Sequence, residues 1–404
     1  MRTVNFLCTI SLVFLLTSGV QHLYGFNDPI RQSGQIIPGA WQKDAYMHLL
    51  EEKRVAVAGN HTSMVADRHL VDTLLSSGIK VVKVFSPEHG FRGEAADGEL
   101  VESYVDTETG IPVISLYGRN RRPTKEQLDD VDIILFDIQD VGARFYTYIS
   151  TMTFILEEAS RKGIPVIVLD RPNPNRHYVD GPVLDPDYVS FIGLHPVPIV
   201  YGMTIGEYAR MVCGEAWLIY DEQCDLTVIT VAGYDHTSRY DLPVPPSPNL
   251  PNMHAVYLYP SLCLFEGTDI SIGRGTAHPF QVFGHPDLPE DQFPFPFTPK
   301  SVSASPNPPQ LGNNCFGRDL RDLPLDELRQ KNQINLEYIL EAYAHFPVKE
   351  DFFNRGFEIR AGNNLLRYQI KVGYTAEDIR NSWQKDLDAF KKIRAKYLLY
   401  PDYE

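Results

Sequence analysis

The sequence is poor in positive charge for its length. It has 404 residues, with 37 Lys and Arg against 52 Asp and Glu, so its formal net charge is −15. A strongly acidic surface repels phosphate backbones and anionic lipid headgroups. We therefore expect neither a nucleic-acid partner nor a membrane partner for the mature chain. The ordinary fractions of hydrophobic and charged residues, 43% and 22%, indicate a globular protein.

The sequence also lacks the short motifs that identify common enzyme classes. The first apolar run is followed by GNHTSM (59–64) and not by a glycine-rich turn, and no GxxxxGK[ST] occurs. Without such turns the backbone does not approach a pyrophosphate closely, so we expect no nucleotide cofactor. No GxSxG and no HExxH occurs, which leaves serine-esterase and zinc-protease chemistry without a motif.

Cysteine is scarce, and its spacing is not that of a zinc site. The five cysteines include Cys8 in the N-terminal segment, and no CxxC or Cys/His cluster occurs. Four cysteines allow three pairings in an oxidising compartment, and the sequence leaves open a bond of Cys213 with Cys224 or of Cys263 with Cys315. We expect structural disulfides or buried thiols, and no metal.

The N-terminus has the features of a secretory signal peptide. Arg2 supplies a positive charge, residues 6–16 form an uncharged apolar run, and small residues follow at 17–19. The run is much shorter than the ~20 residues that span a bilayer. We therefore predict that residues 1–25 are a signal peptide and that the protein is periplasmic or secreted.

Short apolar runs alternate with helical patterns from about residue 54, which predicts an α/β fold with a Rossmann-like open parallel sheet. The predicted strands lie in the runs 54–60, 80–90, 132–142, 165–175, 196–202 and 225–233. The predicted helices cover 67–77, 147–162, 204–213, 325–345 and 376–397. The proline-rich segment 243–251 marks a boundary. We thus divide the mature chain into a Rossmann-like catalytic domain, 26–252, and a smaller C-terminal α+β domain, 253–404.

Polar side chains follow four of the predicted strands, at the edge where open parallel sheets bind ligands. They are Asn60, Glu88, His89, Arg92, Asp137, Gln139, Asp140, Arg144, Asp170 and Asn173. The alternatives are structural: Asp140 and Asp170 would pair with Arg144 and Arg171, or the aspartates would gather a hard cation.

Glu88 is the strongest candidate for a proton donor. It lies between Pro87 and His89 in a turn with two glycines nearby, where other groups can approach it. A second glycine-rich loop, 264–284, carries Glu266, Thr268 and Arg274 and has the composition of a binding loop.

The sequence also has longer motifs, some of which contain these candidate residues. They are, in chain order, SPEHGFRG (86–93), DIQDVGARFYTY (137–148), LDRPNPN (169–175), GPVLD (181–185), YGMTIGEYA (201–209), PPSPNLP (245–251), YPSLCLFEGTDISIGRGT (259–276) and PFQVFGHP (279–286). In order and spacing the sequence resembles the exo-β-N-acetylmuramidase family from about residue 33 to its C-terminus. Cys213 departs from the expected pattern, but it has none of the expected catalytic or binding roles.

The resemblance implies a Rossmann-like domain, a smaller C-terminal domain and an active-site cleft between them. It implies removal of terminal N-acetylmuramic acid from the non-reducing ends of peptidoglycan fragments. Glu88 would be the family's glutamate, and other cleft residues would be His89, Arg92, Asp137, Arg144, Tyr146, Asn173, Glu266 and Arg274.

The substrate's chemistry assigns expected roles to these residues. N-acetylmuramic acid has a lactyl carboxylate, and Arg92, Arg144 or Arg274 would bind it. Asn173, Thr268 or Gln139 would hold acetamido and hydroxyl groups, and Tyr146 or Tyr148 a sugar face. We also expect Asn60 and Asp140 among the substrate-binding residues.

Glu266 or Asp137 would be the second catalytic group, either as nucleophile or as base. Two other functions stay open at this point. One is a non-catalytic periplasmic sugar-binding protein, and the other is a metal-dependent hydrolase that uses Asp137, Asp140 and Asp170.

Overall fold

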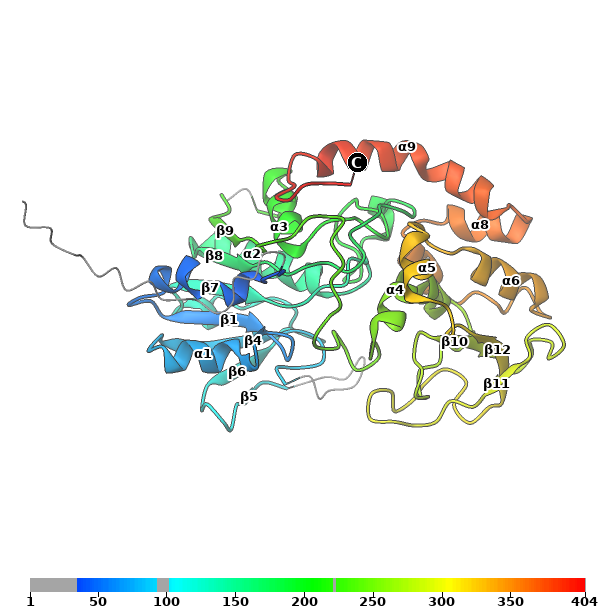
Figure 1. Ribbon diagram of the computed structural model, residues 1–404, viewed down its shortest axis with the longest axis horizontal. Helices are drawn as coiled ribbons and strands as arrows, with labels where there is room; N and C mark the ends of the chain where they lie inside the picture. The colour runs from blue at the N-terminus through cyan, green and yellow to red at the C-terminus, as the bar shows by residue number, and fades with distance from the viewer. Residues whose placement is uncertain (1–34, 93–101, 221–222, 404) are drawn as a thin grey trace, which may run out of the picture. The chain divides into compact units, whose positions relative to one another are not determined.

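The computed structural model describes residues 35–92, 102–220 and 223–403, and residues 36–404 form one compact unit. Its larger part holds a seven-stranded sheet with the order β5-β6-β4-β1-β7-β8-β9 (Figure 1). The strands are β1 (Val55–Gly59), β4 (Val81–Ser86), β5 (Tyr104–Val105), β6 (Pro112–Ser115), β7 (Ile133–Asp137), β8 (Val166–Leu169) and β9 (Leu226–Ile229). Neighbouring strands are parallel except for the antiparallel edge pair β5 and β6.

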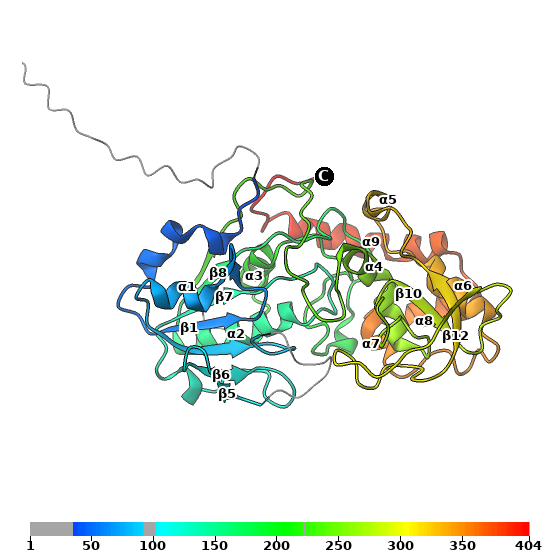
Figure 2. The ribbon, with the colours of Figure 1, turned by 60° about the horizontal axis from the view of Figure 1, so that its bottom comes forward.

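The central strands are continuous apolar runs, and successive side chains along a strand point to opposite faces of the sheet. Both faces of the sheet are therefore apolar and buried. Ala56 and Phe136 belong to one hydrophobic cluster, together with residues of α2 (Tyr148–Lys162) and α3 (Ile205–Gly214). Val57 and Leu135 belong to a second cluster, with residues of α1 (Leu70–Ser76). Figure 2 shows α1 and α2 on opposite sides of β1. The prediction of a Rossmann-like parallel sheet is confirmed.

The C-terminal part is smaller and contains a three-stranded antiparallel sheet in the order β10-β12-β11 (Figure 1). Its strands are β10 (Val282–His285), β11 (Phe295–Phe297) and β12 (Cys315–Asp319). Its helices are α4 (Met253–Leu262), α5 (Leu325–Gln330), α6 (Glu337–His345), α7 (Phe357–Ala361), α8 (Leu365–Val372) and α9 (Ala376–Arg394). The predicted smaller C-terminal domain is therefore confirmed, whereas its boundary at 252/253 stays a prediction.

The other elements are short. Two-residue strands β2 (Met64–Val65) and β3 (Arg68–His69) pair with each other. The 3₁₀ helices are η1 (Gly39–Trp41), η2 (Lys43–Ala45), η3 (Met47–Leu49), η4 (Glu126–Leu128), η5 (Pro186–Tyr188) and η6 (Cys263–Gly267). None of the helices within the described ranges is long and apolar enough to span a membrane.

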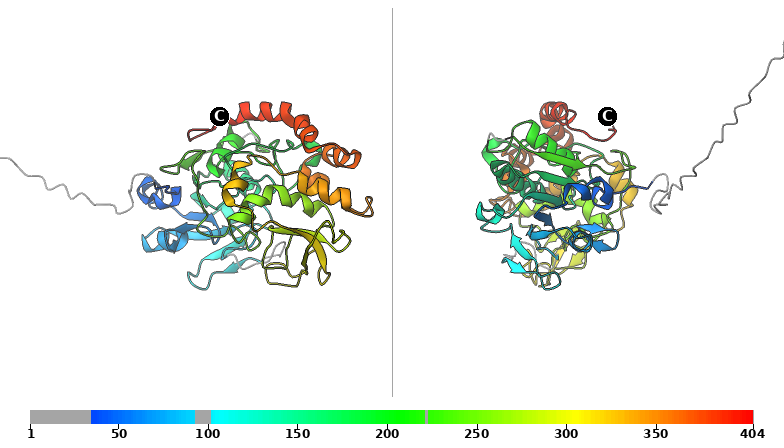
Figure 3. Two further views of the ribbon diagram at one scale, coloured as in Figure 1. Left: turned by 45° about the vertical axis from the view of Figure 1, so that its right-hand side comes forward. Right: turned by 90° about the vertical axis from the view of Figure 1, so that its left-hand side faces the viewer.

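Helix α9 has the apolar face that its sequence predicts. Ile379, Trp383, Leu387 and Phe390 are buried, and a capping box of Thr375 and Asp378 begins the helix. Figures 1 and 3 show α9 leading back to the neighbourhood of α3, where the backbone N–H of Leu399 donates to Glu207. The C-terminal segment thus closes on the large sheet's helical layer.

Two predicted elements are wrong in detail. Residues 196–202 form no strand of the described sheet, and Val200 makes only single bridges to Ala143 and Asp180. Pro196 and Pro198 have no N–H group to donate to a strand ladder. The predicted helical range 325–345 is two helices, α5 and α6, separated by residues 331–336.

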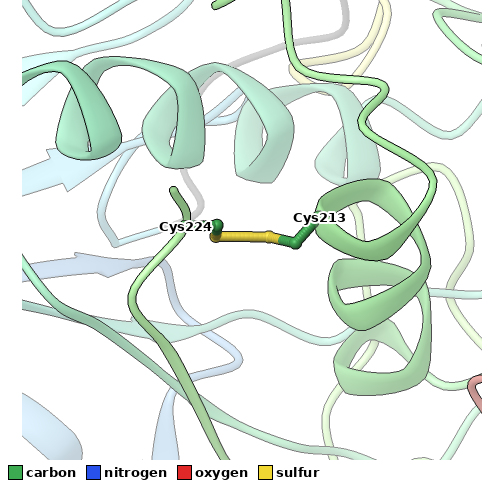
Figure 4. The surroundings of a disulfide bond; sticks show 2 residues. All are labelled: Cys213 and Cys224. Carbon is green, nitrogen blue, oxygen red and sulfur yellow. A yellow bond between two sulfur atoms is a disulfide. The ribbon is translucent and has the colours of Figure 1, made fainter. Parts of the chain in front are cut away.

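One of the two cysteine pairings that the sequence left open is present. A disulfide joins Cys213 in α3 to Cys224 just before β9 (Figure 4). Cys263 and Cys315 are both buried and are not disulfide-bonded, so the alternative bond between them is not formed.

Candidate active site

A pocket of about 370 Å³ opens where the carboxyl ends of β4, β6 and β7 meet the C-terminal part. From the larger part it is lined by Glu88, His89, Tyr117, Arg121, Phe145, Tyr146, Thr147, Ser190, Phe191, Ile192, Ser247, Asn249 and Leu250. From the C-terminal part it is lined by Tyr259, Glu266, Arg274, Phe280, Ile359 and Arg360. The pocket thus lies at the edge of the sheet where the strand-end argument predicts a site.

Glu88 reaches this pocket from a tight turn after β4. His89 and Gly90 follow it with φ angles of 71° and 75°, so two successive residues are left-handed. This conformation is costly for a non-glycine residue such as His89 and is typically kept where function needs it. The Thr147 hydroxyl, at the start of α2, donates a hydrogen bond of 2.9 Å to Glu88 Oε2. Glu88 is therefore a carboxyl group of defined orientation.

Glu266 is held between two arginines on the opposite wall. Arg274 Nη2 donates to Glu266 Oε1 at 2.6 Å, and Arg360 donates to Oε2 through Nε and Nη2, both at 3.1 Å. Burial alone would raise the pKa of Glu266, but the charges and hydrogen bonds of the two guanidinium groups lower it. The carboxylate stays ionised, and these three groups carry a net charge of one positive unit.

The backbone near Arg274 requires glycine on both sides. Gly273 and Gly275 have φ angles of 76° and 80°, and a Cβ on Gly275 would lie 2.5 Å from the carbonyl oxygen of Lys300. The glycine-rich loop therefore folds tightly under Arg274 and aims its side chain at Glu266.

Aromatic rings form much of the pocket wall. Tyr259 contacts Tyr146, Phe145 and Phe280, with ring centroids 5.7, 5.3 and 5.0 Å apart. The Tyr146 hydroxyl donates to the carbonyl of Pro246 at 2.8 Å. These contacts fix flat apolar surfaces of the kind that bind a sugar ring.

A second cavity of about 700 Å³ shares Glu266, Arg274 and Arg360 with the first. Thr268 lines this second cavity, and its hydroxyl donates to the carbonyl of Phe265 at 2.7 Å. Of the predicted site residues, the structure therefore brings Glu88, His89, Tyr146, Glu266 and Arg274 to the first pocket, with Thr268 next to it.

The aspartates after β7 are engaged inside the protein. Asp137 is fully buried and accepts hydrogen bonds from Arg171 Nε at 2.5 Å and Nη2 at 2.9 Å. Asp140 accepts hydrogen bonds from the Tyr201 hydroxyl and from the backbone N–H of Gly142. Burial raises the pKa of Asp140 to about 6, although these bonds lower it. Neither aspartate is among the described residues that line the first pocket.

Four other predicted residues also lie away from the first pocket, as far as the described residues define it. Asn60 bonds Tyr148 and Thr62, while the side-chain amide of Asn173 donates to the carbonyl of Met203. Gln139 donates to backbone carbonyls and lines a separate cavity of about 140 Å³. Arg92 is paired with Asp106 at 3.0 Å and Glu108 at 3.1 Å.

Arg144 is also absent from the described lining of the first pocket, and it pairs with no carboxylate in the described ranges. Its guanidinium donates only to backbone carbonyls: those of Pro182, Val197, Arg360 and Ala361. The sequence-based alternative that Asp140 pairs with Arg144 is wrong, whereas Asp170 accepts hydrogen bonds from Tyr400 and Thr204.

Several pocket residues have no signal in the sequence that assigns them a role. Ser247 and Asn249 lie inside the PPSPNLP motif, whose composition indicates only a stiff connector. Arg121 lies with its guanidinium 4.3 Å from the Phe191 ring centroid, and Arg360 projects from α7. Single arginines in a loop and a short helix have no local pattern that marks them as site residues.

No group of three or more His, Cys, Asp or Glu side chains lies close enough to hold a metal ion within the described ranges. The pocket has instead two carboxyl groups from its described residues, Glu88 and Glu266, facing arginines and aromatic rings. A carboxyl group that can donate a proton, beside aromatic faces and arginines that suit an acidic sugar, is compatible with a glycoside hydrolase.

Comparisons with known proteins agree with this class. The family "Exo-beta-N-acetylmuramidase NamZ, N-terminal" matches residues 55–254, and "Exo-beta-N-acetylmuramidase NamZ, C-terminal" matches residues 257–400. The Peptidoglycan beta-N-acetylmuramidase NamZ of Bacillus subtilis (strain 168) is 40% identical over 375 residues, which cover 88% of this chain and 89% of that protein.

Solved structures are similar as well. A crystal structure of a DUF1343 family protein from Bacteroides fragilis NCTC 9343 is 46% identical with a TM-score of 0.85, covering 91% of this chain and 99% of that one. A second DUF1343 family protein from the same strain is 29% identical with a TM-score of 0.77, covering 92% and 100%. The chain belongs to the NamZ family of exo-β-N-acetylmuramidases and is a glycoside hydrolase.

Proposed function

We propose that this enzyme releases N-acetylmuramic acid from the non-reducing ends of peptidoglycan fragments, with Glu88 as the general acid. The observation that carries this proposal is the position of Glu88 in the first pocket, opposite an arginine-held carboxylate. The relative from Bacillus subtilis is named a peptidoglycan β-N-acetylmuramidase, which supports peptidoglycan as the class of substrate.

Glu88 protonates the leaving oxygen as the glycosidic bond breaks, and a water molecule adds its oxygen to the anomeric carbon and gives up a proton, so that free N-acetylmuramic acid and the shortened fragment are released. The hydrogen bond from Thr147 to Oε2 sets the direction of the carboxyl group toward the substrate. This positioning supports proton transfer from a single, fixed site.

The opposite wall recognises the negative charge of the substrate. N-acetylmuramic acid has a lactyl carboxylate, and Arg274 and Arg360 together have two positive charges against the single negative charge of Glu266. The guanidinium groups therefore bind a second carboxylate without leaving Glu266 unpaired. In this arrangement Glu266 holds the arginines in place, and it does not attack the sugar.

The test is the release of product from defined fragments. The enzyme should liberate free N-acetylmuramic acid from a disaccharide in which this sugar is at the non-reducing end. The isomeric disaccharide with N-acetylglucosamine at that end is the matched control and should stay intact, and uncut glycan strands should release little. Tight binding of the first disaccharide without any release would contradict the proposal and favour a sugar-binding protein.

We also propose that the protein is exported to the periplasm or secreted. The sequence of residues 1–25 has the pattern of a signal peptide, and these residues lie outside the described ranges. The disulfide between Cys213 and Cys224 supports an oxidising compartment. N-terminal sequencing of the protein from cell fractions tests this, and a cytoplasmic protein with residues 1–25 intact would contradict it.

A further inference from the structure

Arg144 is a fully buried cation that contacts two distant parts of the chain. Its Nη1 donates to the carbonyls of Pro182 and Val197 at 2.8 and 2.9 Å. Its Nη2 donates to the carbonyls of Arg360 and Ala361 at 2.9 and 2.8 Å. The guanidinium thus joins loops of the larger part to the C-terminal end of α7.

These bonds suit the end of a helix. The last carbonyls of a helix have no partner within it and carry partial negative charge, so a buried guanidinium both satisfies and attracts them. Burial lowers the pKa of Arg144 to about 9, and the side chain is fully buried. A cation kept at that cost without a carboxylate partner in the described ranges has a specific task in the fold.

Gly362 forms the other half of this contact. It has a φ angle of 85°, and a Cβ at this position would lie 2.5 Å from Arg144 Nη2. The Gly362 carbonyl also accepts a hydrogen bond of 2.9 Å from the backbone N–H of Asp185. Only glycine lets the chain turn this closely against the buried guanidinium.

The fixed helix end carries Arg360. Its backbone carbonyl is bound by Arg144, and its side chain reaches Glu266 in the pocket. We propose that Arg144 and Gly362 form a latch that positions Arg360 for the substrate's carboxylate, so that Arg144 is a positioning residue and contacts no substrate. This inference rests on the proposed function, in which Arg360 helps to bind that carboxylate.

The test compares two substrates with one set of variants. The substrates are an aryl β-glycoside of N-acetylmuramic acid and the same glycoside with its lactyl carboxylate as a methyl ester. The ratio of their kcat/KM values measures carboxylate recognition and is insensitive to a general loss of folded enzyme. The variants are Arg144→Lys and Gly362→Ala, with Arg360→Gln as the direct test of recognition.

Arg176→Lys is the matched control. Arg176 is nearly as buried as Arg144 and also donates only to backbone carbonyls, those of Asn173, Asp235 and Ser238, within the described ranges, but it is not among the described pocket residues. The Arg176→Lys variant should have a lower thermal stability, as Arg144→Lys should, but its acid-to-ester ratio of kcat/KM should equal that of the wild type.

For Arg144→Lys and Gly362→Ala we expect the ratio to fall about 10-fold, chiefly through a higher KM for the acid, because a displaced Arg360 loses one charge-assisted hydrogen bond. A ratio that stays at the wild-type value in both variants but falls in Arg360→Gln would overturn the latch. An acid-to-ester ratio near one in the wild type would show that the enzyme does not recognise the carboxylate. An equal fall of the ratio in Arg176→Lys and Arg144→Lys would show that the effect is a general loss of stability and would overturn the positioning role of Arg144.

Discussion

Replacing Glu266 with glutamine tests whether this residue holds the two arginines in place or acts in catalysis as a nucleophile or base. The carboxylate accepts from Arg274 on one oxygen and from Arg360 on the other. A glutamine has one carbonyl oxygen and one NH₂ group, so it can keep only one of these arginines as a donor. The other guanidinium then faces an amide donor and loses its place in the pocket.

The size of the effect follows from the contacts that are lost. A hydrogen bond to a charged group contributes about 1.5–3 kcal/mol, and the Glu266 side chain is 21% exposed, so solvent screens part of it. We expect a loss of unfolding free energy of about 1–3 kcal/mol at pH 7. Because the two arginines lower the pKa of Glu266, this stabilisation is present above the usual carboxyl pKa and is lost as the pH falls through the lowered value. The difference in unfolding free energy between the wild type and the Glu266→Gln variant should therefore become smaller at acidic pH.

The assay combines denaturant unfolding with steady-state kinetics on the aryl glycoside. If Glu266 holds the arginines, KM should rise and kcat should fall less than about 10-fold. Glu341→Gln, which breaks the Arg318–Glu341 ion pair away from the described pocket residues, is the matched control for stability. A drop in kcat of at least ~100-fold with an unchanged KM would refute this reasoning and make Glu266 a nucleophile or base.

Other contacts in the protein predict the effects of three further perturbations. Replacing Cys213 and Cys224 by serine should lower the unfolding free energy by about 2–3 kcal/mol, as expected for a short closed loop, and leave kcat/KM unchanged; reducing agent should destabilise the wild type equally. Tyr400→Phe removes a hydroxyl that accepts from Val231 at 2.9 Å and donates to Asp170, so denaturant unfolding should show a loss of about 1–3 kcal/mol, and an unchanged midpoint would contradict it. Activity should survive EDTA because Asp137 and Asp170 are bonded to Arg171 and Tyr400, and a loss restored by magnesium or calcium would overturn this assignment.

Much of the fold was predictable because central parallel strands are continuous apolar runs. The runs at 54–60 and 132–142 contain β1 and β7, and α9 follows its helical period. The edge strand β5 and its neighbour β6 were missed because β5 has only two residues and β6 begins at a proline. The run 196–202 is equally apolar, but its two prolines exclude it from a strand ladder. The hydrophobicity of a run therefore predicts that it is buried, whereas its backbone N–H groups decide whether it can pair as a strand.

The candidate site was predictable only in part, for a different reason. Polar residues at strand ends serve either a ligand or the loops that shape the site, and one sequence does not distinguish these uses. Glu88 faces the pocket, whereas Asp137, Asp140 and Asn173 satisfy buried partners. Arg360 is held by tertiary contacts, its backbone carbonyl by Arg144 and its side chain by Glu266, so no local pattern could reveal it.

The most direct test of the account is the turnover of Glu88→Gln on the natural disaccharide. Glutamine still accepts the hydrogen bond from Thr147 but has no proton to give, so hydrolysis should fall by at least ~100-fold while binding of the sugar is kept. An aryl glycoside with a good leaving group needs less protonation and should be partly spared. Near-normal release of N-acetylmuramic acid from the disaccharide by this variant would contradict the assignment of Glu88 as the general acid.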